Sequence, residues 1–136
     1  MELIRRNTDY ALRALVLMAK DRTGDVYVVT RLANEARVPE DFLRKTLQRL
    51  DKAGIIESKR GPKGGFQLSK DPARISVLDV MEAVQGPLAV NRCFLKDIGC
   101  DNFNRCELKE KLIGAQQHMV DLFKSVTIRE LAAERG

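Results

Sequence analysis

The chain has 136 residues, is 44% hydrophobic and carries a formal net charge of +5 at pH 7. This length suits one domain or a small head with an appended helix, and the hydrophobic content argues against a disordered chain. No apolar run reaches the roughly 18 residues of a membrane span, and the first six residues lack the apolar block of a signal peptide. We therefore expect a cytoplasmic protein with reduced thiols and no membrane partner.

The first predicted element is an amphipathic helix over residues 8–20. Its apolar residues make a stripe broad enough to be covered on more than one side. Asp9 lies at its start, where a carboxylate favours the helix dipole, so an ordinary helix-start acid is one interpretation of this residue. Residues 26–29 are β-branched or aromatic, which predicts a short strand against the β-hairpin, or wing, predicted further along the chain.

Residues 30–54 predict two helices joined by a tight turn. Thr30 suits the N-cap of the first helix, because its hydroxyl can accept a hydrogen bond from a free backbone N–H. Pro39 suits the first turn of the second helix, and Gly54 can end that helix in a left-handed conformation. The second helix buries one stripe at i, i+4 and i+7, formed by Leu43, Leu47 and Leu50. The polar residues left on its outer faces are Arg44, Lys45, Gln48, Arg49 and Lys52.

A Gly-Pro-Lys-Gly-Gly stretch at residues 61–65 predicts the tip of a β-hairpin with strands over residues 55–59 and 66–70. All three glycines permit positive φ at the tip. They would also let Arg60 and Lys63 come close to a phosphate-lined groove. A hairpin turn with no role in binding is the simpler interpretation of the glycines. The same glycines can form the turn and also allow the approach to DNA.

Cations are concentrated in the same half of the chain. Residues 1–70 carry 15 Lys+Arg against 9 Asp+Glu, whereas residues 71–136 carry 9 against 10. Within residues 44–63 there are seven cations and two anions. Such clustering is typical of phosphate binding and argues against a helical hairpin with a merely solvated charged face. A basic helix followed by a basic hairpin favours a winged helix-turn-helix that binds DNA.

A further helix is predicted to start at Ser76, which forms a capping box with Asp79, and to end at Gly86. Residues 88–106 keep no consistent period, and a loop of this length is too long for an idle connection in a compact domain. From residue 108 a regular apolar pattern returns, with alternating spacings of four and three residues. It predicts a short coiled-coil seam formed by Leu108, Leu112, Ala115, Met119, Leu122 and Val126.

The seam requires a partner surface. Burial against the chain's own first helix is one interpretation, but two copies of the chain crossing each other explain the seam better. Thr127 and Glu130 then predict a capping box for a last short helix. We therefore expect a homodimer.

The three cysteines lie in the aperiodic segment, at Cys93, Cys100 and Cys106. Their spacing differs from that of zinc sites, where short Cys-x2–4-Cys loops fold round a tetrahedral ion. More widely spaced thiolates converge more easily on a larger object, and soft thiolates favour an iron–sulfur cluster. The spacing also leaves open a thiol redox switch and incidental buried cysteines.

These motifs resemble those of a bacterial family of winged-helix regulators, the iron–sulfur-cluster regulators and nitric-oxide-sensitive repressors of the IscR and NsrR types. The resemblance covers essentially the full length, and it is carried by residues 8–13, 43–50, 53–55 and 60–66 and by the three-cysteine segment. It implies a homodimer that binds a partly palindromic operator in double-stranded DNA. It also implies a cluster held between the wing-bearing head and the dimerisation helix.

Two positions bear on the fourth cluster ligand. In IscR-type members a histidine three residues after the last cysteine completes the ligand set, and here that position is Lys109. In NsrR-type members an aspartate at the start of the partner subunit's first helix does so, and Asp9 matches it. The resemblance thus implies a [4Fe-4S] cluster, favoured over [2Fe-2S], with metal ligands Cys93, Cys100, Cys106 and the partner subunit's Asp9. The first cysteine gap is one residue longer than in those types.

The expected fold is mainly α with a small β-wing and a long C-terminal dimerisation helix. A winged helix-turn-helix DNA-binding domain would occupy residues 1–75. The remaining residues, 76–136, would hold the cysteine loop (88–106), the dimerisation helix (107–126) and a short C-terminal helix.

The expected function is a dimeric transcription regulator whose operator affinity is controlled by an iron–sulfur cluster that senses nitric oxide, redox state or iron and cluster supply. A cluster-free thiol-redox-sensing regulator and a winged-helix protein–protein adaptor are the alternatives. An enzyme is not expected, because the one histidine has no nucleophile beside it in any recognisable arrangement. The expected contacts are Asp41, Arg44 and Lys45 in the major groove, Arg60 in the minor groove, and Thr30, Lys59 and Lys63 on phosphate.

Overall fold

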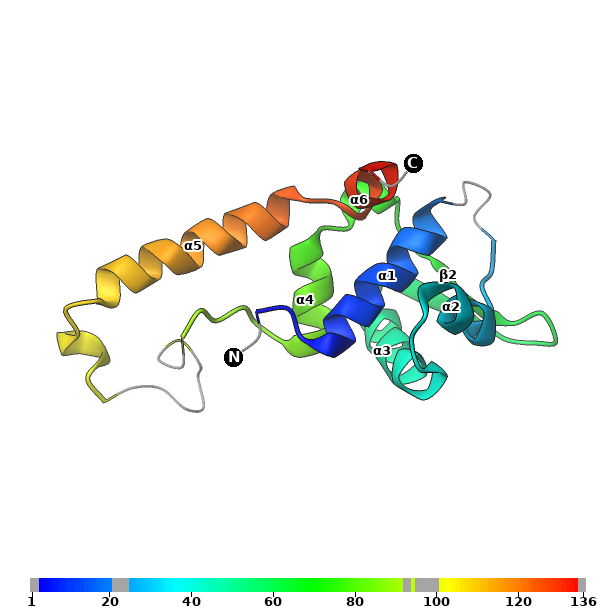
Figure 1. The fold of residues 1–136 in the computed structure, drawn as a ribbon, viewed down its shortest axis with the longest axis horizontal. Helices are drawn as coiled ribbons and strands as arrows, with labels where there is room; N and C mark the ends of the chain where they lie inside the picture. Colours follow the sequence, from blue (N-terminus) through cyan, green and yellow to red (C-terminus); the bar gives the residue numbers. More distant parts are fainter. Residues whose placement is uncertain (1–2, 21–24, 92–93, 95–100, 135–136) are drawn as a thin grey trace.

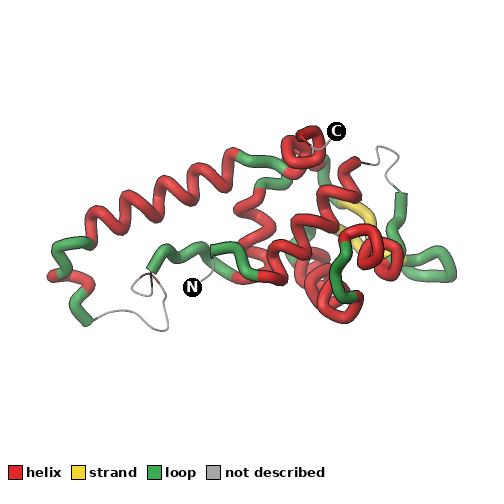
Figure 2. Tube along the Cα trace, in the orientation of Figure 1, coloured by secondary structure: helices red, strands yellow, loops and turns green. Residues whose placement is uncertain are grey.

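The computed structural model describes residues 3–20, 25–91, 94 and 101–134 (Figure 1). Within them the chain is mainly helical, with one two-stranded antiparallel sheet (Figure 2). The elements in chain order are α1 (Arg6–Lys20), α2 (Val29–Ala36), α3 (Glu40–Lys52), β1 (Ile56–Lys59), β2 (Gly65–Leu68), the 3-10 turn η1 (Pro72–Arg74), α4 (Val77–Gln85), the 3-10 turn η3 (Phe103–Arg105), α5 (Lys109–Ser125) and α6 (Ile128–Glu134). None of these helices is long and apolar enough to cross a membrane.

The core is organised around α1, which packs against α2, α3, α4 and α6 (Figure 1). Ala11, Ala14 and Leu15 are fully buried along it. Small residues let the neighbouring helices approach from different sides, which explains the broad apolar stripe of this helix. The predicted burial on more than one side is confirmed, and the helix begins two residues earlier than predicted.

The buried stripe of α3 is confirmed as well, since Leu43, Leu47 and Leu50 have no exposed surface. The end of the helix also follows the prediction. Gly54 has a φ of +79°. Its N–H donates to the carbonyl of Asp51 at 3.0 Å, and the Ile55 N–H donates to the carbonyl of Leu50 at 3.0 Å. This pair of hydrogen bonds is a Schellman motif, which fixes where the chain leaves α3 for the wing.

Two local predictions near residue 30 are wrong. The N-cap of α2 is Val28, without a side-chain hydrogen bond, so Thr30 lies inside the first turn of the helix rather than capping it. The expected strand over residues 26–29 is reduced to a single bridge between Tyr27 and Phe66, so its predicted contact with the wing is confirmed but its length is not. Val29 belongs to the helix instead, because its side chain is buried in the core there, and this packing outweighs the β propensity of a branched residue.

The wing is the antiparallel pair β1 and β2, in which Ile56 pairs with Leu68 and Lys59 pairs with Gly65. Only Gly61 of the three tip glycines has positive φ, at +107°. The expectation for the other two is therefore wrong, and their role is steric. A Cβ at Gly64 would overlap the carbonyl oxygen of Lys59, and one at Gly65 would overlap that of Tyr27.

A second packing unit joins α4 to the C-terminal end of the described chain. The predicted capping box is confirmed: Ser76 Oγ accepts from the Asp79 N–H at 3.0 Å, and Asp79 Oδ2 accepts from the Ser76 N–H at 3.0 Å. Gly86 ends α4 with a φ of +88°. Antiparallel backbone bonds between residues 75–77 and 126–128 bring α6 back onto α1 and bury Ile128.

Helix α5 extends away from the head (Figure 1), and its predicted seam divides into two rows. Met119 and Val126 pack against a cluster centred on α4, and Leu112, seven residues before Met119, is half-buried. The other row, seven residues apart at Leu108, Ala115 and Leu122, is exposed. The expectation of one continuous seam is thus corrected, because the α4 cluster covers Met119 and Val126 of one row and neither of the exposed leucines of the other.

Candidate nucleic-acid interface and cysteine segment

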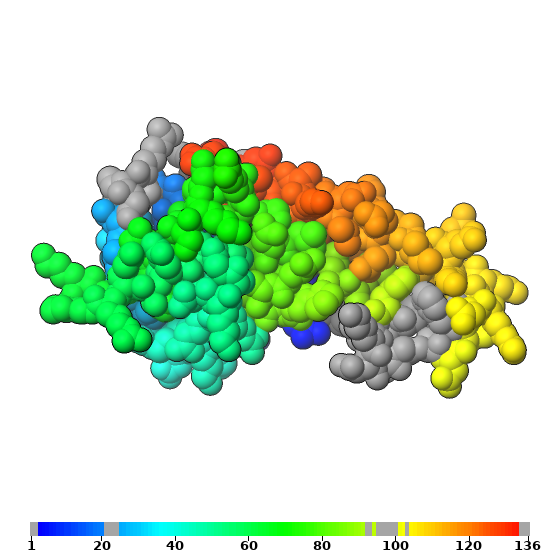
Figure 3. Space-filling model, turned by 180° about the vertical axis from the view of Figure 1, so that it is seen from behind, coloured from blue at the N-terminus to red at the C-terminus, as the bar shows by residue number. Residues whose placement is uncertain are grey.

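The predicted DNA-contacting side chains lie on the surface at one end of the molecule. The burial of three leucines turns the opposite face of α3 outward, and with it Asp41, Arg44 and Lys45, all of which are exposed. Lys59, Arg60 and Lys63 are exposed on the wing. Figure 3 shows the wing tip projecting at the end of the molecule that carries α2 and α3, whereas α5 extends toward the other end. The fold therefore brings the cations of α3 and the wing to a common end.

The Glu40 carboxylate connects two of the predicted DNA-contacting residues, Thr30 and Arg44, in the absence of DNA. Glu40 Oε1 accepts from Thr30 Oγ1 at 3.0 Å and from Arg44 Nη2 at 3.0 Å. The Thr30 bond joins α2 to the first turn of α3. The ion pair is half-exposed, so it adds little stability, but it orients the Arg44 guanidinium along the helix. Arg44 must exchange this partner for a base or phosphate if it is to bind DNA.

The remaining cations differ in how they are held. Lys59 Nζ pairs with Glu57 at 3.3 Å on the same strand. Lys45, Arg60 and Lys63 form no ion pair with any described residue. Without an ion-pair partner among the described residues, these three charges are available to an anionic partner.

Arg49 behaves differently from the other outer-face cations that the sequence grouped with it. Its Nη1 donates to the carbonyl oxygen of Val84 at 2.7 Å, in the last turn of α4. A cation at the C-terminal end of a helix is favourable, because unpaired carbonyls and the helix dipole concentrate negative charge there. Arg49 therefore joins α3 to α4.

Gln85 is a connecting residue that no sequence motif indicates. Its Oε1 accepts from Thr8 Oγ1 at 2.6 Å and from the Arg5 N–H at 3.1 Å, and its Nε2 donates to the carbonyl of Leu3 at 2.9 Å. One amide thus satisfies three groups at the start of α1. Since its partners lie about 80 residues away in sequence, no local pattern could have indicated them.

The chain beyond α4 is fixed to α5 by a second amide. Gln116 Oε1 accepts from the Val90 N–H at 2.8 Å, and its Nε2 donates to the Leu88 carbonyl. The end of α4 and the residues after it therefore contact α1, α3 and α5. The cysteine segment follows directly in sequence.

Of the three cysteines, Cys93 and Cys100 lie outside the described residues. Cys106 is a half-buried free thiol between η3 and α5. Among the described residues of the predicted aperiodic loop, Phe103–Arg105 form a turn of 3-10 helix. No group of three metal-ligating side chains occurs among the residues that the structure describes, so the expected ligand set stays a prediction.

Asp9 lies in the first turn of α1, as predicted, and is half-exposed. Its Oδ2 pairs with Arg13 Nη2 at 2.9 Å, one helical turn further on. This contact is the ordinary role of an acid near a helix start. To bind a metal, the carboxylate would have to exchange Arg13 for it.

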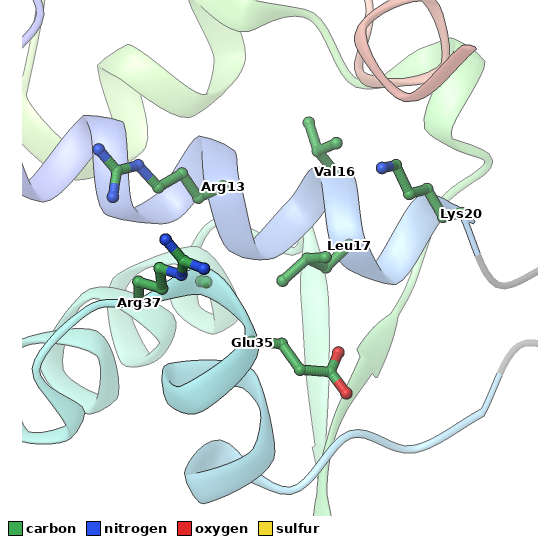
Figure 4. A pocket seen from close by; sticks show the side chains of 7 residues that line it. Arg13, Val16, Leu17, Lys20, Glu35 and Arg37 are labelled. Atoms are coloured by element: carbon green, nitrogen blue, oxygen red, sulfur yellow. The ribbon is translucent and has the colours of Figure 1, made fainter. Parts of the chain in front are cut away.

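Arg13 also borders a pocket of about 340 Å³ between α1 and the end of α2 (Figure 4). The pocket lies at the helix-turn-helix turn, where Arg37 has a φ of +59°, the one positive φ of a non-glycine residue in the described chain. Glu35 is ion-paired with Arg31 at 3.0 Å. The lining residues are Arg13, Val16, Leu17, Lys20, Glu35, Ala36 and Arg37.

Another carboxylate, Asp71, caps η1 and forms an ion pair with Arg129 of α6. The backbone N–H of Ala73 and the guanidinium of Arg129, 3.1 Å away, lower the pKa of the Asp71 carboxyl. The ion pair joins η1 to α6.

Comparison with known proteins identifies the family. The family model named Rrf2, described as an iron-dependent transcriptional regulator, matches residues 4–134. The chain belongs to the Rrf2 family. A regulator of the helix-turn-helix type from Aquifex aeolicus is 34% identical over 124 residues, which cover 90% of this chain and 85% of that protein. The regulator NsrR of Bacillus subtilis is 28% identical over 129 residues, covering 94% and 88%.

Solved structures show that the Rrf2 chain has the winged-helix fold of this family. CymR, the global cysteine regulator of B. subtilis, has a TM-score of 0.79 at 24% identity, covering 98% of both chains. T. potens IscR has a TM-score of 0.77 at 19% identity, covering 98% of this chain and 88% of that one. The predicted fold class and the resemblance to IscR and NsrR regulators are confirmed. The protein is a transcription regulator rather than an enzyme.

Proposed function

We propose that this Rrf2 regulator binds a partly palindromic operator as a homodimer, through α3 and the wing. The observation that carries the proposal is the set of exposed cations at one end of the molecule, of which Lys45, Arg60 and Lys63 have no ion pair among described residues. Asp41, Arg44 and Lys45 would read base edges, and Arg60 would enter the minor groove. Thr30, Lys59 and Lys63 would contact phosphate.

The test is salt-dependent binding of the full-length protein to duplexes selected from a random pool. We expect the logarithm of the binding constant to fall linearly with the logarithm of the salt concentration, because bound cations release counterions from DNA. A triple variant, Lys45→Glu with Arg60→Glu and Lys63→Glu, should lose binding. If the triple variant keeps the wild-type DNA affinity, or if the wild type shows no salt-dependent DNA binding, a protein–protein adaptor is favoured.

The dimer is proposed from the exposed row on α5. Leu108, the N-cap of α5, is 62% exposed, and Leu122, two heptads further on within the helix, is 49% exposed. Apolar side chains at this spacing are typical of a helix that packs on a second helix. The described head covers the other row only, so a second copy of the chain is the partner that we propose. Two heads would then read two half-sites of a symmetric operator.

Control by an iron–sulfur cluster is the finer part of the proposal. The family description is iron-dependent, and the donor set predicted from the sequence suits iron–sulfur chemistry, since three soft thiolates accompany one carboxylate. The described members of that set allow it: Cys106 is a free thiol, and Asp9 has an exposed carboxylate with an exchangeable partner. Cys93, Cys100 and Cys106 with the partner subunit's Asp9 would hold a [4Fe-4S] cluster. Because a carboxylate is a hard donor, the iron that it holds would be the labile one, which suits a sensor of a small reactive molecule.

A cluster-free thiol switch is the second candidate. Cys106 is a free thiol that is only half-buried, so a small oxidant in solution can reach its sulfur. CymR of Staphylococcus aureus has been solved in a form described as oxidized, and its fold matches with a TM-score of 0.73 at 23% identity, covering 97% of this chain and 96% of that chain.

Anaerobic purification with visible absorbance, iron analysis and sulfide analysis separates these two candidates. Charge-transfer absorbance with about four iron and four sulfide per chain is expected for the proposed [4Fe-4S] form. Colourless protein without iron, whose DNA binding changes when Cys106 is oxidised, would establish the thiol switch instead.

A further inference from the structure

Phe42 is an exposed aromatic residue on the first turn of α3, with 53% of its surface accessible. The other aromatic residues around the helix-turn-helix behave differently, since Tyr27 and Phe66 are 4% and 8% exposed. A single exposed apolar side chain is ordinary in a folded protein. What distinguishes Phe42 is its position, on the helix that carries the proposed base-reading residues.

The helix geometry places Phe42 beside those residues. Lys45 follows it by three positions, and Asp41 precedes Lys45 by four, so the three side chains occupy neighbouring positions on the helix surface. All three are exposed. The backbone beneath them is fixed, because the Phe42 carbonyl accepts from Thr46 Oγ1 at 2.9 Å and the Leu43 N–H donates to the Pro39 carbonyl at 3.0 Å.

We propose that Phe42 is a specificity-determining residue that contacts the C5-methyl group of a thymine in the major groove. The inference rests on the proposed DNA binding and adds to it a base and a chemical group. Residues in the first turns of a recognition helix are those that meet base edges. A phenyl ring has no hydrogen-bonding group, so it cannot read guanine, cytosine or adenine through their donors and acceptors.

Thymine is the base whose major-groove edge offers an apolar group, and apolar side chains such as Phe contact its methyl. The charges around Phe42 support duplex DNA over an apolar protein surface as the occupant. Lys45 is exposed without an ion pair among described residues, and the preceding residue, Arg44, is exposed as well. An apolar partner would have to desolvate these cations, whereas DNA offers them phosphates and guanine edges. Phe42 would thus contact the apolar thymine methyl, while the charged residues around it contact the polar groups of the DNA.

The experiment replaces thymines by uracil, which removes the methyl group and leaves base pairing unchanged. Full-length protein is first used to select a duplex from a random pool, and each thymine of that duplex is then replaced singly. We expect wild-type affinity to fall about fourfold at one thymine in each half-site, the effect of burying one methyl-sized group. Phe42→Ala should bind the thymine and uracil forms of that position equally well, and Phe42→Leu should keep part of the preference.

Val28→Ala is the matched control. Val28 is also an exposed apolar residue, with 48% of its surface accessible, but it lies at the N-cap of α2 rather than on α3. Its variant should keep the full thymine preference. Because Phe42 is exposed, Phe42→Ala should also keep the wild-type thermal midpoint and oligomeric state, which shows that a change in base preference is not a folding defect.

The outcomes separate this inference from the function on which it rests. If wild-type protein selects a site but Phe42→Ala keeps the same thymine preference, the methyl contact is refuted and DNA binding stands. Equal weakening on selected and random DNA would also refute it. Conversion of Phe42→Ala to a different oligomeric state would assign Phe42 to an interface between copies. Wild-type protein that selects no DNA at all would overturn both.

Discussion

Arg49 in α3 donates a hydrogen bond from Nη1 to the carbonyl oxygen of Val84, 2.7 Å away, in the last turn of α4. The bond joins the helix proposed to read DNA to the segment that leads into the cysteines. It also removes Arg49 from the set of cations available to phosphate. Arg49 and Lys45, one turn apart on α3, therefore have different roles.

Arg49→Met should lower the free energy of unfolding by about 1.5–3 kcal/mol, because the Val84 carbonyl loses a charged donor. The salt slope of DNA binding should stay unchanged. The control is Lys63→Met, at a proposed phosphate contact, which should leave stability unchanged and reduce the salt slope by about one. Urea denaturation and binding titrations at several salt concentrations measure both quantities. A reduced slope in Arg49→Met with wild-type stability would show that Arg49 contacts phosphate after all.

Lys63→Ala and Arg44→Ala should separate phosphate contact from base reading. Lys63 lies at the wing tip with no ion pair among described residues, so its loss should weaken binding to all sequences alike and lower the salt slope by roughly one. Arg44→Ala should cost about 1–3 kcal/mol on the selected site and little on random DNA. Competition titrations with both DNAs give the comparison. Indistinguishable effects of the two variants would refute this division of roles.

Leu122→Lys should produce a monomer with little change in the stability of the subunit. Leu122 is 49% exposed, so its ammonium would be solvated in the monomer but buried without a partner in the proposed dimer. Met119→Lys is the contrasting variant, since Met119 packs on the α4 cluster and its replacement should destabilise the subunit itself. Sedimentation equilibrium and thermal unfolding provide the two readouts. A Leu122→Lys protein that remains dimeric would place the interface elsewhere.

Asp9→Ala should leave folding and dimerisation intact but shorten the lifetime of the proposed cluster, because one ligand is lost. Cys100→Ala should prevent its assembly, and Asp9→Cys should slow its reaction with nitric oxide or oxygen, since a thiolate is the softer ligand. Arg13→Ala serves as a control, because it removes the 2.9 Å ion pair but keeps the carboxylate. The decay of visible absorbance measures each lifetime. Equal lifetimes in wild type and Asp9→Ala would exclude Asp9 as a ligand.

Gly65→Ala should destabilise the protein more than Gly61→Ala. A Cβ at Gly65 would overlap the Tyr27 carbonyl, which accepts the Phe66 N–H at 2.9 Å, so the wing would have to separate from the chain before α2. We expect a loss of about 1–3 kcal/mol there, as for other overpacked sites. Gly61 has open space around it, and its variant should cost about 1–2 kcal/mol for the positive-φ backbone alone. Chemical denaturation of both variants gives the ranking, which would be reversed if backbone strain outweighed the overlap.

The sequence by itself determined most of the helices, the two wing strands and the family that the chain resembles. Leu43, Leu47 and Leu50 share a face of α3 because helical period alone places them there. Ser76 and Asp79 form a capping box, and Gly54 ends α3, through bonds that span only a few residues. The motifs that indicated the IscR and NsrR regulators are equally local. Interactions of this kind depend on neighbouring residues, so their spacing in sequence is enough to predict them.

Tertiary structure decided the roles of side chains whose partners are distant in sequence. Arg49 looks like the other cations of α3 until the end of α4, 35 residues on, accepts its hydrogen bond. Gln85 contacts the start of α1 across about 80 residues of sequence. Position 65 must be glycine only because the Tyr27 backbone passes too close to leave room for a Cβ. On α5 the heptad pattern predicts both rows equally well, yet α4 covers one of them. Periodicity tells which residues seek an apolar contact, whereas the packing of helices from different parts of the chain decides which neighbour provides it.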